Sequence, residues 1–371
     1  MNGTSSSLQF CKIHDLRLDG VTKTTGRHGI IDQSTGPTVF HENLYLRNFD
    51  DAFTIYNSNN RHVRAIRIVT ANTGIRLLKG GTLTPPNATF IDNFYISDCA
   101  TNPINIVSDV AGETATVVKI SKGVVESNTG PIVITGYPTA TELDSIYVEG
   151  NGRGQDIYIK GVSSSFAPTN IILRNIRGRG NVTTQANMIK IDDCDKILIE
   201  NCLAVNYTSS MILLNKNAEY ELNVVNPGLA EGTPNLITQT TSLTTTLARL
   251  AGSVSLNRVT GHIALLPAST SIGDVVILGS AGRYVSTARA DSNLPGVVLY
   301  PAAAGDTPGV IANNGLALVN VNAAVAAGDT LSTSTTAGQA KVNNTQTDPR
   351  KIIGFAMEAT GAAGLAWAKI L

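Results

Sequence analysis

Short segments of alternating apolar and polar residues recur through the first two hundred positions of the chain. Each copy reads apolar, any, apolar, any, and then Asn, Asp, Gly, Ser or Thr. The second apolar positions are Leu18, Leu46, Ile68, Ile96, Val125, Val148, Leu173 and Ile199, with a mean spacing of about 26 residues. Alternation with period two predicts a strand with one buried face, and the polar or glycine residue after it predicts a bend with positive φ.

A second motif of the same kind alternates with the first. Its inward positions are Ile31, Ile55, Leu77, Ile106, Ile134, Ile159, Ile191 and Leu213, again about 26 residues apart. A two-strand unit cannot bury its apolar face alone, whereas stacked units form a continuous core. The sequence therefore predicts an all-β fold, a right-handed parallel β-helix of about eight coils over residues 1–225. We expect the side chains of Ile106, Ile134 and Ile159 to stack inside it.

Two other repeat folds fit the pattern less well. A leucine-rich repeat has a similar period, but its Leu-rich consensus with a fixed Asn is absent. An antiparallel sandwich also shows evenly spaced strands. Two motifs per period in fixed alternation favour the β-helix over both.

The pattern changes near residue 225. A Thr-rich stretch, TPNLITQTTSLTTT at 233–246, predicts a linker or wrapping segment over residues 226–252. Short apolar runs separated by Gly, Asp, Asn and Pro follow, with dense alanine from residue 281 onward. Residues 253–371 are therefore expected to form a small β-sandwich or barrel domain, used for trimerisation or binding.

Composition and charge exclude several classes of protein. Of the 371 residues, 42% are hydrophobic and 15% charged, with 28 Lys+Arg against 28 Asp+Glu, so the formal net charge is zero. The lack of a basic excess argues against a nucleic-acid partner. No stretch approaches 18 apolar residues, which argues against membrane insertion, and residues 1–10 show no secretory signal pattern.

The cysteines and the usual motifs predict no cofactor and no metal. Four cysteines in so long a chain do not make a disulfide scaffold. Cys99 and Cys202 each follow a bend residue and are expected to be buried thiols that pack as small hydrophobes. No His/Cys cluster has metal-ligand spacing, and no phosphate loop or nucleophile elbow occurs.

A resemblance follows from the two-part organisation and from two C-terminal segments. These are AAVAAGDTLSTSTTAGQAKV at 323–342 and KIIGFAMEATGAAGLAWAKIL at 351–371, which resemble small β modules of phage structural proteins. A parallel β-helix followed by a compact β domain resembles the tailspikes and neck appendages of tailed phages. The helix resembles the pectate-lyase-like superfamily through its periodicity.

The resemblance implies a homotrimer, a host surface polysaccharide as ligand and often glycan-cleaving activity. It also implies a virion location, in the tail or neck, with action at the host cell surface. The first coil begins near residue 11 without a capping helix or a virion attachment domain. Proteins normally cover the exposed end of a sheet. We therefore expect either a fragment of a longer protein or a second chain that caps this coil.

The first candidate site is a column of outward residues that precede the bends. They are Asp19, Arg47, Val69, Ser97, Glu126, Glu149, Arg174 and Glu200. Glu126 and Glu149 would lie on adjacent coils about 4.8 Å apart at the backbone, near the roughly 5–5.5 Å carboxyl separation of a retaining glycosidase. We expect repulsion to raise the pKa of one of them, as a general acid requires. Tyr147 would stack on a sugar and Arg174 would hold an acidic substituent; the alternative is a solvated face.

The second candidate site lies on the second strand of each coil. Tyr158, Lys160, Lys190 and Asp192 are expected to project outward on successive coils, with Asp156 at the rim. A ring beside charged groups suits a sugar, which has apolar faces and hydroxyl edges. Asp192 or Asp156 would be the catalytic carboxylate of an intersubunit groove. The alternative is a cross-strand charge pair between Lys160 and Asp192.

A third segment resembles polygalacturonase-like β-helices in part. DDAFTI at 50–55 matches their paired aspartates, and NTGIRLLK at 72–79 matches their basic strand through Arg76. The Gly-His-Gly of that family is missing. Asp50 and Asp51 are equally typical of turn formers.

Three functions follow from these observations. The first is a phage tailspike or appendage that binds and depolymerises a host polysaccharide by hydrolysis or elimination. The second is a non-catalytic structural or adsorption protein of the virion with the same fold. The third is a free polysaccharide lyase or hydrolase. The Ala- and Gly-rich β tail favours the first two.

Overall fold

The structure is a computed structural model of the chain. It describes residues 11–33, 38–56, 59–78, 87–108, 116–151, 154–161, 167–181, 185–192, 194–214, 221–230, 233, 235–239, 251–255, 259–266, 270–278, 284–286, 295–300 and 307–371. The chain divides into two compact units, the first formed by residues up to 221 with 227–234, and the second by 222–226 with 235–371.

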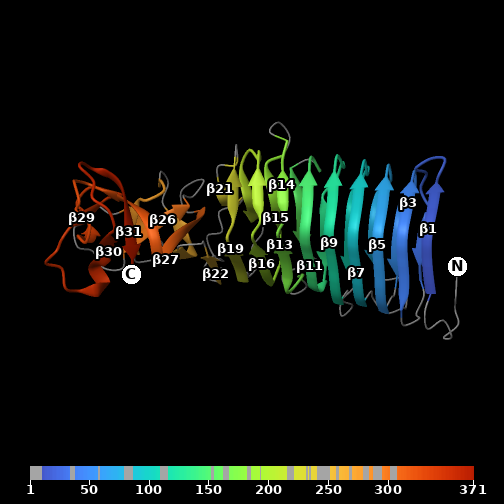
Figure 1. Cartoon of the computed structure of the whole chain (residues 1–371), viewed down its shortest axis with the longest axis horizontal. Coiled ribbons are helices and arrows are strands. Elements are labelled where there is room, and N and C mark those ends of the chain that lie inside the picture. Colours follow the sequence, from blue (N-terminus) through green and yellow to red (C-terminus); the bar gives the residue numbers. More distant parts are fainter. Residues whose placement is uncertain are drawn as a thin grey trace. The chain divides into compact units, whose positions relative to one another are not determined.

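The first unit is a parallel β-solenoid of about seven turns, which confirms the predicted fold class. Its long strands pair in parallel, each with the next one along the chain (Figure 1). They are β1 (Cys11–Asp19), β3 (Val39–Arg47), β5 (Asn59–Val69), β7 (Asn87–Ser97), β9 (Thr116–Glu126) and β11 (Thr139–Glu149). Shorter strands continue this sheet, namely β13 (Ile171–Arg174), β14 (Arg177–Arg179), β16 (Lys196–Glu200), β17 (Leu203–Val205) and β20 (Gly228–Ala230).

A second parallel sheet closes each coil. Its strands in the first unit are β2 (Ile30–Asp32), β4 (Asp51–Tyr56), β6 (Thr73–Leu78), β8 (Asn102–Ser108), β10 (Ile132–Gly136), β12 (Gln155–Lys160), β15 (Asn187–Ile191) and β18 (Ser210–Leu214). The register aligns Ile106 with Ile134 and Ile134 with Ile159. All three side chains are fully buried, which confirms the predicted core.

The predicted bend is confirmed after β3, β5, β7, β9 and β11, and a second bend precedes it by five residues; Gly20, after β1, lacks a positive φ. The later column has positive φ at Asn48, Thr70, Asp98, Ser127 and Gly150. The earlier column has positive φ at Asp15, Asn43, Ala65, Asn93, Lys122 and Ser145. Each long strand therefore crosses two faces. We name the strand residues before the earlier column the first face, and those between the two columns the middle face.

The predicted register is wrong at its last two copies. Asp144 pairs with Arg174 and Arg174 with Glu200, whereas Glu149 pairs with Arg179. Leu173 and Ile199 therefore continue the column of Leu143 on the first face, instead of the column of Val148. Both bends use the same left-handed residue types, so Asn175 and Asn201 were assigned to the later bend although they belong to the earlier one.

The second motif is displaced by one residue at its two ends. Ile31 pairs with Thr54, so that Asp32 takes the inward position beside Ile55. At the other end Leu213 pairs with Lys190, and Leu214 continues the column of Ile191. Both copies contain consecutive apolar residues, and a one-residue slip reverses which of them face inward.

The buried cysteines are confirmed. Cys99, Cys194 and Cys202 are buried and unbridged. Burial in the apolar interior raises the pKa of Cys99 and of Cys202 to about 12. These thiols pack as small hydrophobes.

The second unit contains a closed five-stranded barrel, which specifies the predicted sandwich or barrel. Its strands pair around the ring in the order β27 (Thr307–Val321), β31 (Gly364–Ile370), β30 (Ile352–Ala356), β28 (Thr330–Thr333), β29 (Ala340–Val342) and back to β27. Ala317, Ala340, Ala356, Ala366 and Ala368 belong to its buried core. Because a barrel of so few strands has a narrow interior, small side chains fill it, which explains the dense alanine of this region.

The second unit also contains strands outside the barrel ring. They are β19 (Glu221–Val225), almost wholly in this unit, β21 (Asn235–Gln239), β22 (Ala251–Ser255), β23 (Val259–Leu266), β24 (Val275–Leu278), β25 (Tyr284–Ser286) and β26 (Pro295–Tyr300). β23 and β26 pair antiparallel with the first half of β27. One 3-10 turn, η2 (Pro349–Lys351), precedes β30.

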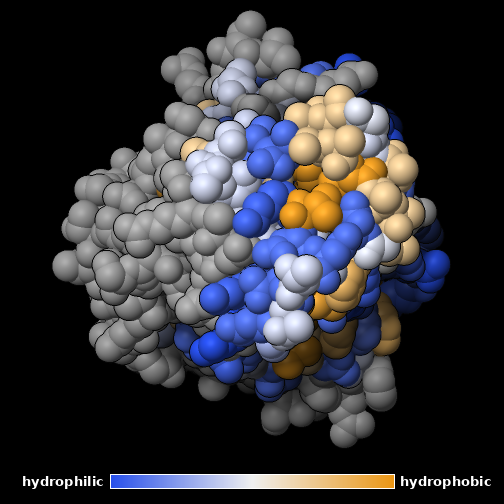
Figure 2. All heavy atoms as spheres, turned by 90° about the vertical axis from the view of Figure 1, so that its left-hand side faces the viewer, coloured by the Kyte–Doolittle hydropathy of each residue, from blue (hydrophilic) through white to orange (hydrophobic). Residues whose placement is uncertain are grey.

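An apolar patch lies on the outer surface of the barrel. Its members are Phe355, Met357, Leu365 and Trp367, which are 37%, 55%, 50% and 40% exposed. The backbone N–H of Met357 donates to the carbonyl of Trp367, so that these two residues are neighbours across β30 and β31. Figure 2 shows hydrophobic residues gathered among hydrophilic ones on the face that it presents. We name Phe355, Met357, Leu365 and Trp367 the barrel patch.

Candidate functional site

Two glutamates of the predicted site lie side by side at the ends of adjacent strands. Glu126 ends β9 and Glu149 ends β11, and the two residues are paired in register across the parallel sheet. Arg179, at the end of β14, is next in the same column. Outward positions in register on neighbouring coils are about 4.8 Å apart at the backbone, so the three side chains share one surface.

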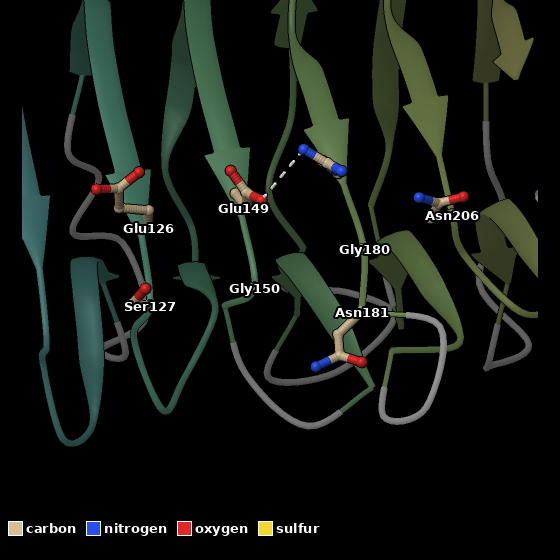
Figure 3. Close-up of a pocket in the computed structure, with 8 residues that line it drawn as sticks. Glu126, Ser127, Glu149, Gly150, Gly180, Asn181 and Asn206 are labelled. Atoms are coloured by element: carbon tan, nitrogen blue, oxygen red, sulfur yellow. Dashed lines mark ion pairs between the residues drawn. The ribbon is translucent and has the colours of Figure 1, made fainter. Parts of the chain in front are cut away.

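These residues line an open groove of about 620 Å³. Its lining consists of Glu126, Ser127, Glu149, Gly150, Arg179, Gly180, Asn181 and Asn206. Figure 3 shows the two glutamates on successive strands, with the later bends below them. The guanidinium of Arg179 forms an ion pair with Glu149 at 3.7 Å, drawn as a dashed line.

Each glutamate accepts a hydrogen bond from a tyrosine. The Tyr95 hydroxyl donates to Glu126 Oε1 and the Tyr147 hydroxyl donates to Glu149 Oε2, both at 2.6 Å. The bond to Glu126 raises the pKa of Tyr95. Burial, followed by the bond to Glu149, raises the pKa of Tyr147. Both hydroxyls therefore remain donors, and they hold the two carboxylates in place.

Arg174 lies outside this groove, which corrects its predicted position beside Glu149. It lies on the first face, where its guanidinium contacts Glu200 at 2.5 Å and Glu142 at 3.1 Å. Arg179 takes the position that was predicted for Arg174. The sequence carries a signal for Arg179. A charged outward residue directly precedes a glycine both in Val148-Glu149-Gly150 and in Gly178-Arg179-Gly180.

A buried polar network lies behind the groove. Asn128, Asn151 and Tyr207 directly follow the lining residues Ser127, Gly150 and Asn206. Asn128 donates to Asn151 Oδ1 at 2.6 Å, and the Tyr207 hydroxyl donates to Asp156. These bonds tie successive bends of the groove to one another.

Asp156 is the ionisable centre of this network, which corrects its predicted place at the rim. Its side chain is fully buried. It accepts hydrogen bonds from the Asn151 backbone N–H and from Gln185 Nε2, both at 2.9 Å. Gln185 in turn accepts from the backbone N–H of Asn181, a lining residue, at 2.8 Å. Asp156 therefore supports the groove from inside and does not reach a ligand.

Ionisation of Asp156 is expected to make stability depend on pH. Burial raises its pKa to about 6, above the unfolded value of about 3.9, so the folded state keeps a proton that the unfolded chain has lost. The contribution of Asp156 to stability is therefore present below about pH 4 and is lost as the pH rises to about 6, by about 3 kcal/mol in total. Urea unfolding at several pH values should show this decrease in the wild type and lose it in Asp156→Asn.

The matched control is Asp98→Asn, at an exposed bend residue with positive φ that Asn also tolerates. This variant should keep the wild-type decrease in stability between pH 4 and 6. An unchanged decrease in Asp156→Asn would contradict the assignment.

The second predicted site forms a separate cluster on the other sheet. The Tyr158 hydroxyl donates to Asp192, and Lys190 lies 3.7 Å from the Asp192 carboxylate and 4.7 Å from the centre of the Tyr158 ring. The Asp192 side chain is buried in these contacts with the outward Tyr158 and Lys190 side chains, so it is less exposed than predicted. Lys160 is exposed and pairs in register with Thr135. The structure thus brings Tyr158, Lys190 and Asp192 into contact with one another, without Lys160.

The paired aspartates of the third segment are held by local structure. Asp50 accepts from the Gly26 backbone N–H at 2.6 Å and from Asn72 Nδ2 at 2.9 Å. Asp51 is buried and contacts Arg76 at 3.0 Å and His28 at 3.5 Å. Asp50 therefore acts as a turn former. Lys79, the last residue of the segment at 72–79 that resembles the basic strand, lies outside the described residues.

Among the residues described, no three or more His, Cys, Asp or Glu side chains are grouped so as to hold a metal ion. Within that same part of the chain, no helix has the length and apolar character needed to cross a membrane.

No family model and no curated protein matches the sequence. Several solved structures are similar at low identity, and three of them follow. The tailspike protein of Acinetobacter baumannii phage AM24 has a TM-score of 0.36 and 10% identity, over 98% of this chain and 77% of that one. The Pantoea stewartii protein WceF, described as a glycan biofilm modifying enzyme with a bacteriophage tailspike-like parallel β-helix fold, has a TM-score of 0.32 and 12% identity over 96% of this chain.

The third structure is the N base of head fiber gp8.5 from bacteriophage phi29, with a TM-score of 0.23 and 17% identity. It covers 30% of this chain and 92% of that one. The present chain spans only 52% of the length of WceF. Two of the three structures are called tailspike or tailspike-like, which is the resemblance predicted from the sequence.

Proposed function

We propose that this protein is a tailspike-like appendage of a phage virion that binds a host surface polysaccharide in the Glu126–Glu149 groove and cleaves it. The observation that carries the proposal is the in-register pair of carboxylates in an open groove. Two carboxyl groups on adjacent coils approach the roughly 5–5.5 Å separation of retaining glycosidases. Glu126 and Glu149 would share the acid and nucleophile or base roles.

The remaining predicted residues have secondary places in this proposal. Tyr147 supports Glu149 through its hydroxyl. Arg179, which takes the position predicted for Arg174, contributes hydrogen bonds to a bound sugar. Arg174 on the first face, and Tyr158, Lys160, Lys190 and Asp192 on the other sheet, would contact a longer chain only outside the groove. We place cleavage at the groove.

The direct test is incubation with purified bacterial surface polysaccharides. The products are assayed for new reducing ends and for absorbance from unsaturated sugars. Reducing ends alone indicate hydrolysis, and both signals together indicate elimination. If no polysaccharide is bound or cleaved, the proposal is wrong.

A non-catalytic adhesion protein is the second candidate. The observation in its favour is that each glutamate is already engaged by a tyrosine hydroxyl, and Glu149 also by Arg179. Such fixed carboxylates suit recognition of sugar hydroxyls. Polysaccharide binding without either cleavage signal would select this function over the first.

Assembly as a homotrimer is part of the proposal and is supported by the barrel patch. Exposed apolar side chains that adjoin one another mark interaction surfaces, and cyclic closure buries them without a growing end. Trp367→Glu should reduce the mass in solution, measured by light scattering, to about a third. Thr335→Glu, at an exposed hairpin residue between β28 and β29, should leave the mass unchanged. A monomeric wild type at micromolar concentration would contradict trimerisation.

A further inference from the structure

Guanidinium groups and phenol rings alternate along the middle face on four consecutive coils. Arg17 is paired with Tyr45, Tyr45 with Arg67, and Arg67 with Tyr95. The guanidinium carbon of Arg17 lies 4.7 Å from the centre of the Tyr45 ring, and that of Arg67 lies 5.1 Å from the centre of the Tyr95 ring. We name these four residues the Arg–Tyr ladder.

The ladder holds Arg67 in position without neutralising it. A guanidinium over an aromatic face is fixed by cation–π attraction and stacking. Its N–H groups lie at the edge of its plane, where they match the two oxygens of a carboxylate. Arg67 is exposed, and it forms no ion pair with any residue that the structure describes.

The surroundings of Arg67 add positive charge. Arg47, on the preceding coil, is also exposed and forms no ion pair within the described part of the chain. The acidic groups of the middle face are bound to residues other than Arg67 and Arg47. Asp19 contacts Arg17 at 2.8 Å, Glu126 accepts from Tyr95 at 2.6 Å, and Glu149 contacts Arg179 at 3.7 Å. The whole chain has zero formal net charge, so this excess is local to the ladder.

The ladder leads into the groove. Its last member, Tyr95, donates its hydroxyl to Glu126, which lines the groove on the next coil. With a rise of about 4.8 Å per coil, the distance from Arg17 to Glu126 along the sheet is about 19 Å. A linear ligand laid across the coils can therefore contact both arginines and reach the two glutamates.

We propose that the Arg–Tyr ladder binds an anionic polysaccharide. Sugar carboxylates pair with Arg67 and with Arg47 beside it, and sugar rings pack against the Tyr45 and Tyr95 side chains. The chain continues across the coils into the groove at Glu126. This inference rests on the proposed function and adds to it the class of substrate, a carboxylate-bearing glycan rather than a neutral one.

The test compares two arginines of the same strand. Arg67→Gln removes the charge from the ladder, whereas Arg64→Gln removes an exposed charge from the first face, three residues away and across the bend at Ala65. Arg64 is in register with Glu42 and Asp92, so its surroundings are acidic. Arg67→Gln should bind at least about tenfold more weakly, and Arg64→Gln should bind like the wild type.

The probes are purified acidic capsular polysaccharides of bacteria, each also prepared with its carboxyl groups reduced to alcohols, together with neutral capsular polysaccharides. Binding is measured by calorimetry on the full chain, with thermal unfolding of each variant as the control for folding. The wild type should bind an acidic glycan, lose that binding after carboxyl reduction, and bind more weakly at high salt.

The outcomes separate this inference from the proposed function. Absence of binding to every glycan, acidic or neutral, overturns the proposed function and the ladder with it. Equal binding of a glycan and its carboxyl-reduced form overturns the ladder alone. Equal loss of affinity in Arg67→Gln and Arg64→Gln, or no loss in either, also overturns the ladder alone.

Discussion

Glu126→Gln and Glu149→Gln should each slow polysaccharide cleavage by at least about a hundredfold. Each change keeps the size of the side chain but removes its negative charge, and with it the ability to exchange a proton or act as a nucleophile. Both positions are outward on the middle face, so folding should be unchanged. The measurement is the rate of reducing-end release from one cleavable glycan, at equal concentrations of folded protein.

Two controls make this comparison specific. Glu200→Gln changes an outward glutamate of the same sheet that lies on the first face, beside Arg174. Asp192→Asn changes the carboxylate of the Tyr158–Lys190 cluster. Both controls should keep wild-type rates. Full activity in both groove variants would mean that the glutamates are only a solvated face, and a loss confined to Asp192→Asn would move the site to the other sheet.

Ile134→Ala should destabilise the protein by about 2–5 kcal/mol. The Ile134 side chain is fully buried between those of Ile106 and Ile159 on the adjacent coils. Shortening it leaves a cavity in a stack whose neighbours are fixed by the parallel sheet on both sides. The shift is measured as the change in urea midpoint, with the urea dependence of unfolding determined for each variant.

Val133→Ala is the matched control for this substitution. It removes two methyl groups one position away on β10, where the side chain is only partly buried. Its midpoint should shift much less. Equal shifts for Ile134→Ala and Val133→Ala would contradict the inward register of this strand.

The repeat was predictable because most inward positions carry large aliphatic residues at a regular spacing. That signal fails where the interior is filled from elsewhere. Gly178 follows Val148 in the inward column, and a Cβ added there would lie 2.5 Å from the hydroxyl oxygen of Tyr207. The Tyr207 side chain occupies the space that an aliphatic residue would fill. Without an apolar residue at 178 the motif is not visible, and Arg179 was missed.

The pairing of Glu126 with Glu149 was predictable because their two copies of the motif are intact. The roles of Tyr95 and Asp156 could not be predicted from the sequence. Tyr95 reaches Glu126 from a different coil, 31 residues earlier in the chain, and no spacing within one motif encodes that contact. The Asp156 side chain turns inward because Tyr207, Gln185 and Asn151 supply hydrogen-bond donors there. An aspartate in a strand is otherwise expected at the surface.

The crystal structure of Glu149→Gln with an oligosaccharide of the recognised polysaccharide tests the central claim most directly. We predict a sugar ring in the groove, with oxygen atoms within about 3 Å of the side chains at positions 126 and 149 and a contact to Arg179. An oligosaccharide bound at the Tyr158–Lys190 cluster or on the second unit, with the groove empty of sugar, would contradict the account.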